Sequence, residues 1–241
     1  MIELIENTIL WDQLCWRYLK IDRLINSLRE GYIYFAAANQ FEDEWEGATF
    51  INSADYCHTG LFKPLMMFNN AFKQLQRLTK INCWHKSDYE NYAMWKLYAN
   101  DKKGVAITTT PRLMKLSIEP YRIKPNYVEE NLIIGDVNYN ELDLENQNKS
   151  EIERFFNKHI SFSYEKEIRL TVSLRLAEEC GVIVPDEGIK LKVDYSKLIE
   201  SIIIGPNIDL TERKLLMNVL IEEGLESKLK DSVLSKKPWF L

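Results

Sequence analysis

Apolar side chains recur at steps of three and four residues in several stretches of this chain, which is the spacing of one face of an α-helix. One stripe covers residues 21–28 and is followed by Gly31, a residue suited to the left-handed cap that ends many helices. Others cover residues 61–75 and 209–224, the last with a capping aspartate at its start. We expect a helix in each of these three stretches.

Short apolar or alternating runs between these stripes predict β-strands. They lie at residues 16–19, 32–35, 105–108, 189–193 and 201–204. Ser87 and Glu90 have the spacing of a capping box and predict a further helix that continues to about Ala99. Residues 140–150 are almost free of large apolar side chains and predict a flexible surface loop. No repeat or shift in composition divides the chain, so we expect residues 1–241 to form a single mixed α+β domain with a central, largely antiparallel sheet flanked by helices.

One further predicted strand carries an unusual set of charges. It runs from Tyr164 to about Leu174, and its residues Glu165, Glu167 and Arg169 are spaced two apart, so on a strand their side chains point to the same face. Two carboxylates and a guanidinium are costly to bury and useful in a cleft. The alternative is the solvent-facing side of an antiparallel strand, where such charges pair across strands.

Aromatic residues supply a second set of candidates. Trp84, Tyr92, Trp95 and Tyr98 lie in or just before the helix that is predicted to end near residue 99. They either pack in the core or form one wall of a pocket on which a flat ring stacks. Arg17 stands between two aromatic residues, and its guanidinium either rests on one of those rings or points into a cleft to hold a phosphate or carboxylate.

Composition narrows the function classes. Hydrophobic residues make up 46% and charged residues 28%, as in ordinary soluble proteins. The formal net charge of −5 argues against a general nucleic-acid binder, although it leaves room for a local basic patch. No stretch has the apolar length of a membrane span, and the first six residues lack the basic start of a signal peptide. Four irregularly spaced cysteines are typical of reduced thiols, so we expect a cytoplasmic protein that does not bind membranes.

Cofactor motifs are sparse. The nine glycines form neither a Walker loop nor a dinucleotide-binding loop. The pairs at residues 57–58 and 83–85 combine cysteine with histidine, but their spacing differs from that of zinc modules, so we expect no metal cofactor. One alternative stays open at this point: Asp43, Glu46, Glu165 and Glu167 are the residue types that a magnesium-dependent nuclease uses.

Several of these segments together resemble a known bacterial family. They are Trp16-Arg17-Tyr18, the segment 31–35, Phe41-Glu42-Asp43, Cys83-Trp84-His85, Met94-Trp95, Tyr98-Ala99, Lys103-Gly104-Val105, Tyr164-Glu165-Lys166-Glu167-Ile168-Arg169 and the segment 203–206. In this order they are similar to domain-of-unknown-function family twenty-nine seventy-one, over nearly the whole chain. The resemblance implies a bacterial protein and does not imply an activity.

The order of the elements also resembles the ADP-ribosyltransferase layout, in which an early basic residue contacts NAD and a late glutamate stabilises the charge that develops as nicotinamide leaves. This resemblance implies that Arg17 holds NAD, that Glu167 is the catalytic carboxylate and that Glu165 orients the acceptor. Tyr34 or Phe35 would flank the nicotinamide. Residues 35–38 read Phe-Ala-Ala-Ala, and so lack the hydroxyl side chains that many transferases carry there.

Three function classes follow. The first is an ADP-ribosyltransferase-like enzyme, a toxin or defence effector that uses NAD on a macromolecule, with Glu167 and Glu165 as catalytic residues. Its ligand-binding residues would be Arg17, Tyr18, Tyr34, Phe35, Asp43, Trp84, Trp95, Tyr98 and Arg169. The second is a non-catalytic binding or interaction module of a bacterial defence or mobile-element system, in which the strand charges form an ion-pair network with Arg17 or Lys103. The third is the metal-dependent nuclease.

Overall fold

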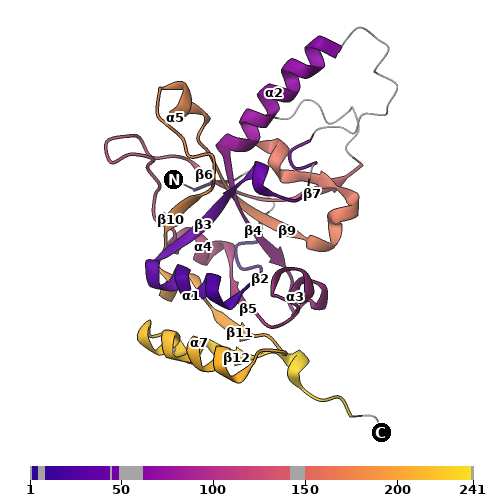
Figure 1. Ribbon diagram of the computed structural model, residues 1–241, viewed down its shortest axis with the longest axis vertical. Helices are drawn as coiled ribbons and strands as arrows, with labels where there is room; N and C mark the ends of the chain where they lie inside the picture. Colours follow the sequence, from indigo (N-terminus) through magenta and orange to yellow (C-terminus); the bar gives the residue numbers. More distant parts are fainter. Residues whose placement is uncertain (1, 5–8, 44, 49–61, 142–149, 240–241) are drawn as a thin grey trace. The chain divides into compact units, whose positions relative to one another are not determined.

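The computed structural model describes residues 2–4, 9–43, 45–48, 62–141 and 150–239, with the backbone alone at 2–4 and 62–69. The chain forms two compact units, each assembled from three separate stretches of sequence (Figure 1). The first unit consists of Met1–Ile9, Tyr34–Cys83 and Pro120–Lys190. The second unit consists of Leu10–Ile33, Trp84–Glu119 and Leu191–Leu241.

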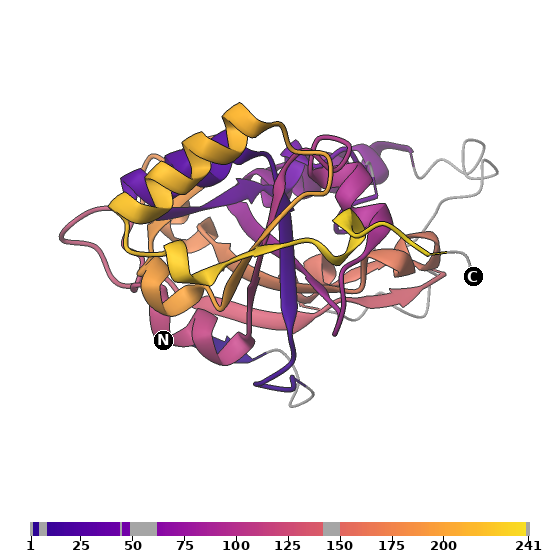
Figure 2. The same ribbon diagram turned by 90° about the horizontal axis from the view of Figure 1, so that it is seen from below.

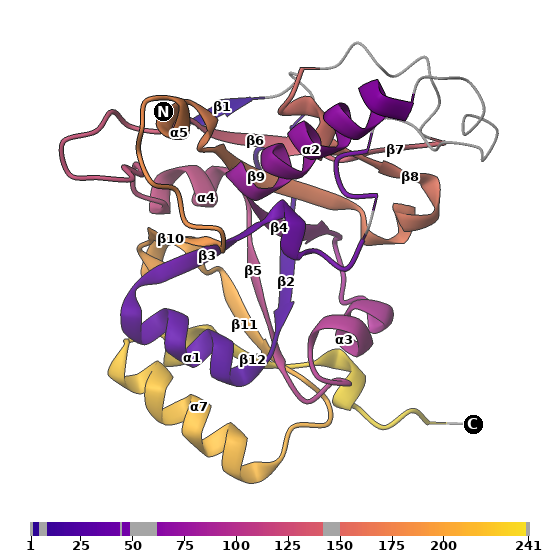
Figure 3. The same cartoon turned by 45° about the horizontal axis from the view of Figure 1, so that its top comes forward.

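The second unit contains three of the strands that the short apolar runs predict (β2, β5 and β11), together with two that they do not. They are β2 (Cys15–Leu19), the end of β4 (Thr79–Lys86), β5 (Val105–Thr109), β11 (Ser201–Ile204) and β12 (Leu229–Asp231), in the spatial order β4-β2-β5-β11-β12 (Figure 3). All neighbouring pairs are antiparallel except β11 and β12, which are parallel. In this register Arg17 lies opposite Ile107.

Helices cover this part of the sheet. They are α1 (Ile21–Glu30), α3 (Tyr92–Tyr98), α4 (Pro111–Ser117), α6 (Tyr195–Leu198) and α7 (Leu210–Glu222), with short 3₁₀ turns η6 (Glu226–Lys228) and η7 (Val233–Ser235). Helix α1 ends at Gly31, whose φ of 63° is the left-handed cap that its sequence predicts. Helix α7 is capped by Asp209, whose carboxylate accepts from two backbone amides of the first turn. The two helices lie side by side (Figure 2).

The first unit is built around β9 (Glu167–Ser173). Its other strands are β1 (Ile2–Leu4), β6 (Leu132–Asp136), the start of β4 and most of β3 (Tyr32–Ala37), in the order β1-β6-β9-β4-β3, and β3 also pairs with β10 (Ile189–Lys192). A separate parallel pair joins β7 (Asn138–Asn140) to β8 (Asn157–His159). The helices are α2 (Phe62–Leu78) and α5 (Arg175–Glu179), with 3₁₀ turns η1 (Ala38–Gln40), η4 (Glu153–Phe156) and η5 (Ile160–Glu165).

These elements confirm the α+β class and the largely antiparallel sheet. The helices predicted from residues 21, 61 and 209 onward are present, as are the five predicted strands. Whether the two units act as a single domain stays a prediction. Residues 142–149 of the predicted loop lie outside the described residues, while Asn140 closes strand β7. Within the described part of the chain, no helix has both the length and the apolar composition to cross a membrane.

The predicted start of α3 is wrong. The helix is capped four residues later than the sequence suggested, by Asn91, whose side-chain oxygen accepts from the amides of Ala93 and Met94. Ser87 instead exchanges hydrogen bonds with the backbone of Tyr89. Glu90 is unavailable for a capping box, since its carboxylate accepts from side chains and backbone elsewhere in the second unit.

Candidate functional site

A group of buried charged side chains in the first unit contains most of the chemistry that the sequence singled out. This charged cluster consists of Asp43, Glu46, Lys158, Glu165, Glu167 and Arg169. Strand β9 contributes Glu167 and Arg169, which share a face because they are two residues apart. Strand β8 contributes Lys158, η5 contributes Glu165, and the segment after η1 contributes the other two carboxylates.

Arg169 is the centre of one half of the charged cluster. Its guanidinium is fully buried and binds both carboxylate oxygens of Glu46, at 2.5 and 2.9 Å. Its Nε donates to Glu167 at 2.5 Å, and Nη1 also donates to the backbone carbonyl of Phe155 at 2.6 Å. The planar fork of arginine fits two oxygens of one carboxylate, which is why arginine suits a buried bidentate pair of this kind.

Lys158 organises the other half. Its ammonium lies 2.5 Å from Glu165 Oε2 and 3.2 Å from Glu167 Oε1, with Asp43 Oδ2 at 3.8 Å. It also lies 4.5 Å from the centre of the Phe162 ring. Glu167 therefore bridges the two cations, with one oxygen on Lys158 and the other on Arg169.

Glu165 reaches this cluster by a route that differs from the prediction. Strand β9 begins at Glu167, and Glu165 is the last residue of the η5 turn. Lys166 connects them with a φ of 43°, a left-handed conformation that is uncommon for a residue other than glycine. The three predicted residues do lie close together. Glu165, however, is positioned by this turn and by its ion pair with Lys158, and not by sharing a strand face with Glu167 and Arg169.

Burial and neighbouring charges move the carboxyl pKa values in opposite directions. Burial, followed by the hydrogen bond and the charge of Glu167, raises the pKa of Glu165 to about 7. Burial also acts to raise the pKa of Glu167, but Arg169, the hydrogen bond with Glu165 and Lys158 outweigh it and hold that pKa well below its ordinary value. Burial raises the pKa of Glu46 in spite of Arg169. Glu165 thus titrates near neutral pH, whereas Glu167 stays ionised there.

Little of the charged cluster reaches solvent. The side chain of Glu165 is 6% exposed and that of Glu167 is 9% exposed, whereas Glu46 and Arg169 are completely covered. The thiol of Cys83 lies nearby, and burial raises its pKa well above the ordinary value. A ligand would have to displace existing ion pairs to reach either oxygen of Glu167.

The other predicted residues of the first unit have structural contacts. Phe35 is fully buried. The Tyr34 hydroxyl accepts from the amide of Gly188 at 2.9 Å and donates to Gln40 at 3.1 Å. Gly188 has no room for a side chain, because a Cβ there would lie 2.2 Å from the Phe35 carbonyl oxygen. Both aromatic residues therefore join β3 to the segment before β10.

The remaining predicted residues belong to the second unit. Arg17 lies over the buried ring of Trp84, 5.8 Å from its centre. Tyr18 and Trp95 pack edge to face in the core at 5.0 Å, and the Tyr18 hydroxyl accepts from the amide of Asn91. Of this group only Tyr98 is largely exposed. The prediction of a shared cleft for Arg17 and Glu167 thus involves residues of different units.

Sequence reasoning missed one residue of the charged cluster. Lys158 was not a candidate, although it is the only described cation bound to both Glu165 and Glu167. Pairing of the strand charges with Arg17 or Lys103 stays a prediction. Arg17 lies over the Trp84 ring, and the positive charge of Lys103 acts to lower the pKa values of Asp209 and Glu212. A lysine seven residues before a Glu-x-Glu pair gives no periodic signal, so only the turn through η5 reveals the contact.

Among the described residues, no group of three or more histidine, cysteine, aspartate or glutamate side chains is arranged to hold a metal ion. The carboxylates that the nuclease hypothesis names are directed at Lys158 and Arg169 instead. A magnesium ion at these carboxylates would thus have to displace existing ion pairs.

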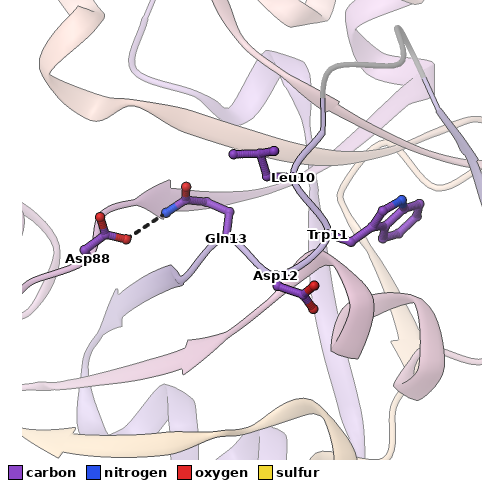
Figure 4. Close-up of a pocket in the computed structure, with 5 residues that line it drawn as sticks. All are labelled: Leu10, Trp11, Asp12, Gln13 and Asp88. Carbon is purple, nitrogen blue, oxygen red and sulfur yellow. Dashed lines mark hydrogen bonds between the residues drawn. The ribbon is translucent and has the colours of Figure 1, made fainter.

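A shallow depression of about 340 Å³ lies on the second unit (Figure 4). It is lined by Leu10, Trp11, Asp12, Gln13 and Asp88, and Gln13 donates to Asp88 across it at 3.1 Å. Asp12 is held by two hydrogen bonds from Arg112, at 2.8 and 2.9 Å. No residue predicted as a ligand or catalytic group lines this depression, and its two carboxylates already have partners.

Comparison with known proteins supports the family resemblance. Residues 94–170 match a family described as "Protein of unknown function (DUF2971)". The match covers most of α3 and the strands through most of β9, and it includes Lys158, Glu165, Glu167 and Arg169. No curated protein and no solved structure matches the chain. The family resemblance is therefore confirmed over residues 94–170, its extension to nearly the whole chain stays a prediction, and the family's description names no activity.

Proposed function

We propose that this chain is a non-catalytic binding or interaction module, and that the charged cluster is part of its structural core. The observation that carries this proposal is the state of Glu167. One of its oxygens accepts from Arg169, the other from Lys158, and its backbone amide donates to the Tyr139 hydroxyl at 2.8 Å. A catalytic carboxylate must face a ligand, whereas this one faces two internal cations.

The rest of the charged cluster supports the same role. The guanidinium of Arg169 is fully buried and directs its donors at Glu46, Glu167 and a backbone carbonyl. A buried charge is tolerated in a folded protein when all of its partners are present. Removing one partner leaves the other charge uncompensated and lowers the free energy of unfolding by about 3–5 kcal/mol. The module would present its surface to a macromolecular partner, and its setting in a bacterial defence or mobile-element system is part of the proposal.

Glu167→Gln tests this structural role. The substitution keeps the shape of the side chain and removes the negative charge between Lys158 and Arg169, so we expect it to lower stability by about 3 kcal/mol, roughly 10 °C in Tm. The matched control is Glu226→Gln, at an exposed residue of the second unit, which should leave Tm within about 1 °C. Equal melting temperatures for wild type and Glu167→Gln would refute the structural role.

A second candidate is an ADP-ribosyltransferase-like enzyme that uses NAD. The observation in its favour is the Glu165–Glu167 pair itself: two adjacent carboxyl groups with separated pKa values, one of them near 7, are a common arrangement for acid–base chemistry. In this candidate Glu167 would stabilise the developing positive charge, Glu165 would orient the acceptor and Arg17 would hold NAD.

Thermal melts with and without millimolar NAD separate the two candidates, because a ligand that binds only the folded state must raise Tm. For the binding module we expect no shift in wild type. A shift that disappears in Arg17→Ala but persists in Arg23→Ala, an exposed arginine of α1, would favour the enzyme. Release of nicotinamide by wild type but not by Glu167→Gln would then favour the transferase and rule out the non-catalytic binding module.

A further inference from the structure

One buried carboxyl group of the first unit lies outside the charged cluster and has no partner among the described residues. Glu130 is 8% exposed, and its Oε1 is shielded from solvent without accepting a hydrogen bond. Burial raises its pKa, and no neighbouring cation acts against this shift. Burying a carboxylate is costly unless a donor or a cation accompanies it, so an unpaired one calls for an explanation.

Two tyrosine hydroxyls lie near this carboxyl group. The amide of Glu130 donates to the Tyr121 carbonyl at 2.9 Å and closes a loop, and Tyr127 lies between the two in sequence. Burial, followed by the charge of Glu130, raises the pKa of Tyr121. Desolvation, the hydrogen bond and charge of Cys180 and then the charge of Glu130 raise the pKa of Tyr127. Both hydroxyls are thus close enough to respond to the Glu130 charge, although neither donates to its Oε1.

The basic residues of the same loop are directed elsewhere. Arg122 donates to the Tyr127 carbonyl at 2.8 Å and to the Glu129 carboxylate at 2.6 Å. Lys124 is exposed and forms no ion pair with Glu130, while its carbonyl accepts from the Tyr127 amide at 3.0 Å. These hydrogen bonds fix the shape of the loop, and neither of its two cations neutralises Glu130.

The charge around this loop is negative. Residues 174–188 lie against it, since Cys180 contacts Tyr127. Residues 120–131 and 174–188 together carry six carboxyl side chains, two arginines and one lysine, and Arg77 adds a fourth cation through its ion pairs with Glu178 and Asp186. Six negative and four positive charges leave a formal charge of −2, which favours a cationic ligand over an anionic one.

The same two segments also expose large apolar side chains. Val128 is 67% exposed, Leu176 is 69% exposed and Ile183 is 89% exposed. The first belongs to the loop that holds Glu130, and the other two belong to the segment that contacts it through Cys180. Exposed apolar side chains beside a polar centre are typical of surfaces that bind other proteins.

We propose that Glu130, Tyr121 and Tyr127 bind the ammonium group of a lysine side chain that a protein partner supplies. An ammonium has three donors, and the carboxylate and the two phenolic oxygens offer three acceptors. The flat fork of an arginine would need both oxygens of the carboxylate, of which Oε1 is shielded. The exposed apolar side chains would contact the residues beside that lysine. This inference rests on the proposed binding function, for which it names the partner class.

The test is fluorescence anisotropy with a labelled peptide in which one Leu-Lys-Leu sequence is flanked by glycines and serines. Salt of about 0.15 M screens contacts between exposed charges. Wild type should bind this peptide. The same peptide with its lysine acetylated should bind about tenfold more weakly, because acetylation removes the charge and two of the three donors. A peptide with arginine in place of lysine should also bind more weakly.

Glu130→Gln should weaken binding of the lysine peptide about tenfold, which is the loss of one charged hydrogen bond. Its Tm should not fall, because the substitution breaks no ion pair within the protein. Tyr127→Phe removes one acceptor and should weaken binding several-fold. The matched control is Glu187→Gln, at an exposed carboxylate of the facing segment, which makes the same change in charge and should bind as wild type.

Absence of wild-type binding would overturn the proposal, as would equal losses in Glu130→Gln and Glu187→Gln. Equal binding of the acetylated or the arginine peptide would refute recognition of an ammonium. Tighter binding of spermine that depends on Glu130 would overturn the proposal in favour of a free polyamine, and a fall in the Tm of Glu130→Gln would reveal a structural role instead. None of these failures changes the Glu167→Gln or NAD melts, so they are distinguishable from failure of the binding module.

Discussion

Glu165 and Glu167 are close in sequence, share a lysine and yet have pKa values on opposite sides of the ordinary one. The difference between the two pKa values comes from Arg169, which contacts Glu167, whereas Glu165 is paired with Lys158. Two carboxylates this close cannot both ionise cheaply, so the one with fewer cations keeps its proton to higher pH. At the scale of single residues, position relative to one guanidinium decides the protonation state.

This asymmetry predicts a pH dependence for Glu165→Gln. Because the pKa of Glu165 rises on folding from 4.5 to about 7, its contribution to stability is fully present below pH 4.5 and is lost as pH rises through 7. Glutamine mimics the protonated acid and does not lose its proton. We therefore expect the Tm of the variant, relative to wild type, to increase by several degrees between pH 5 and pH 8.

Thermal melts at several pH values between 5 and 8 measure this difference, with Glu226→Gln as the exposed control. The lowered pKa of Glu167 has the opposite sign: its contribution is present above pH 4.5 and is lost only as pH falls below it. Glu167 therefore does not obscure the effect in this range. Parallel curves for wild type and Glu165→Gln would show that Glu165 is not protonated near neutral pH.

At the scale of elements, a buried lysine joins β4 to the segment before β10. Lys80 is completely buried, and its ammonium donates to the carbonyls of Arg77 and Pro185, each at 2.8 Å, and to that of Glu187. Burial lowers its pKa to about 8. Since a lysine ammonium has three donors, these carbonyls use all of them, and the side chain acts as a structural link.

Lys80→Met should break this link. The substitution keeps most of the apolar volume but leaves three buried carbonyls without their donor, so we expect a loss of about 2–4 kcal/mol. The loss should be accompanied by faster amide hydrogen exchange in the segment around residues 185–187. Lys73→Met, at an exposed lysine of α2, is the matched control. Unchanged exchange in that segment would show that the three hydrogen bonds do not hold it.

At the scale of the whole molecule, the two units are interleaved in sequence. Each consists of three stretches, and three of the chain's five passages between the units lie within strands, namely β3, β4 and β10. Neither unit is a continuous segment that could be expressed alone. Strands that belong to both units tie the formation of one to the formation of the other, as expected for a single cooperative domain.

We therefore predict one unfolding transition for the whole chain. In calorimetry the measured enthalpy should equal the van't Hoff enthalpy, and near- and far-UV circular dichroism should follow the same urea curve. Two resolved transitions, or spectroscopic probes that change at different urea concentrations, would show that the units unfold independently and that the single-domain prediction is wrong.

The sequence by itself determined the local elements and the α+β class. The stripe of α1, the left-handed cap at Gly31 and the aspartate before α7 each act within a few residues, so their consequences are readable from spacing alone. The strand β11 is likewise a short apolar run that ends at a Gly-Pro pair. In all of these the residues that determine the structure are neighbours in the chain.

Only the tertiary structure decided the partners of the buried charges. Arg169 is paired with Glu46, 123 residues away, and Glu90 with Ser232, 142 residues away. Because Glu90 makes this second contact, the cap at the start of α3 is Asn91. Local spacing does not predict such pairs, because the partner of a buried charge is the opposite charge that the tertiary fold places next to it. The residue types of the candidate site were thus readable in advance, whereas their protonation and their role depend on contacts that only folding creates.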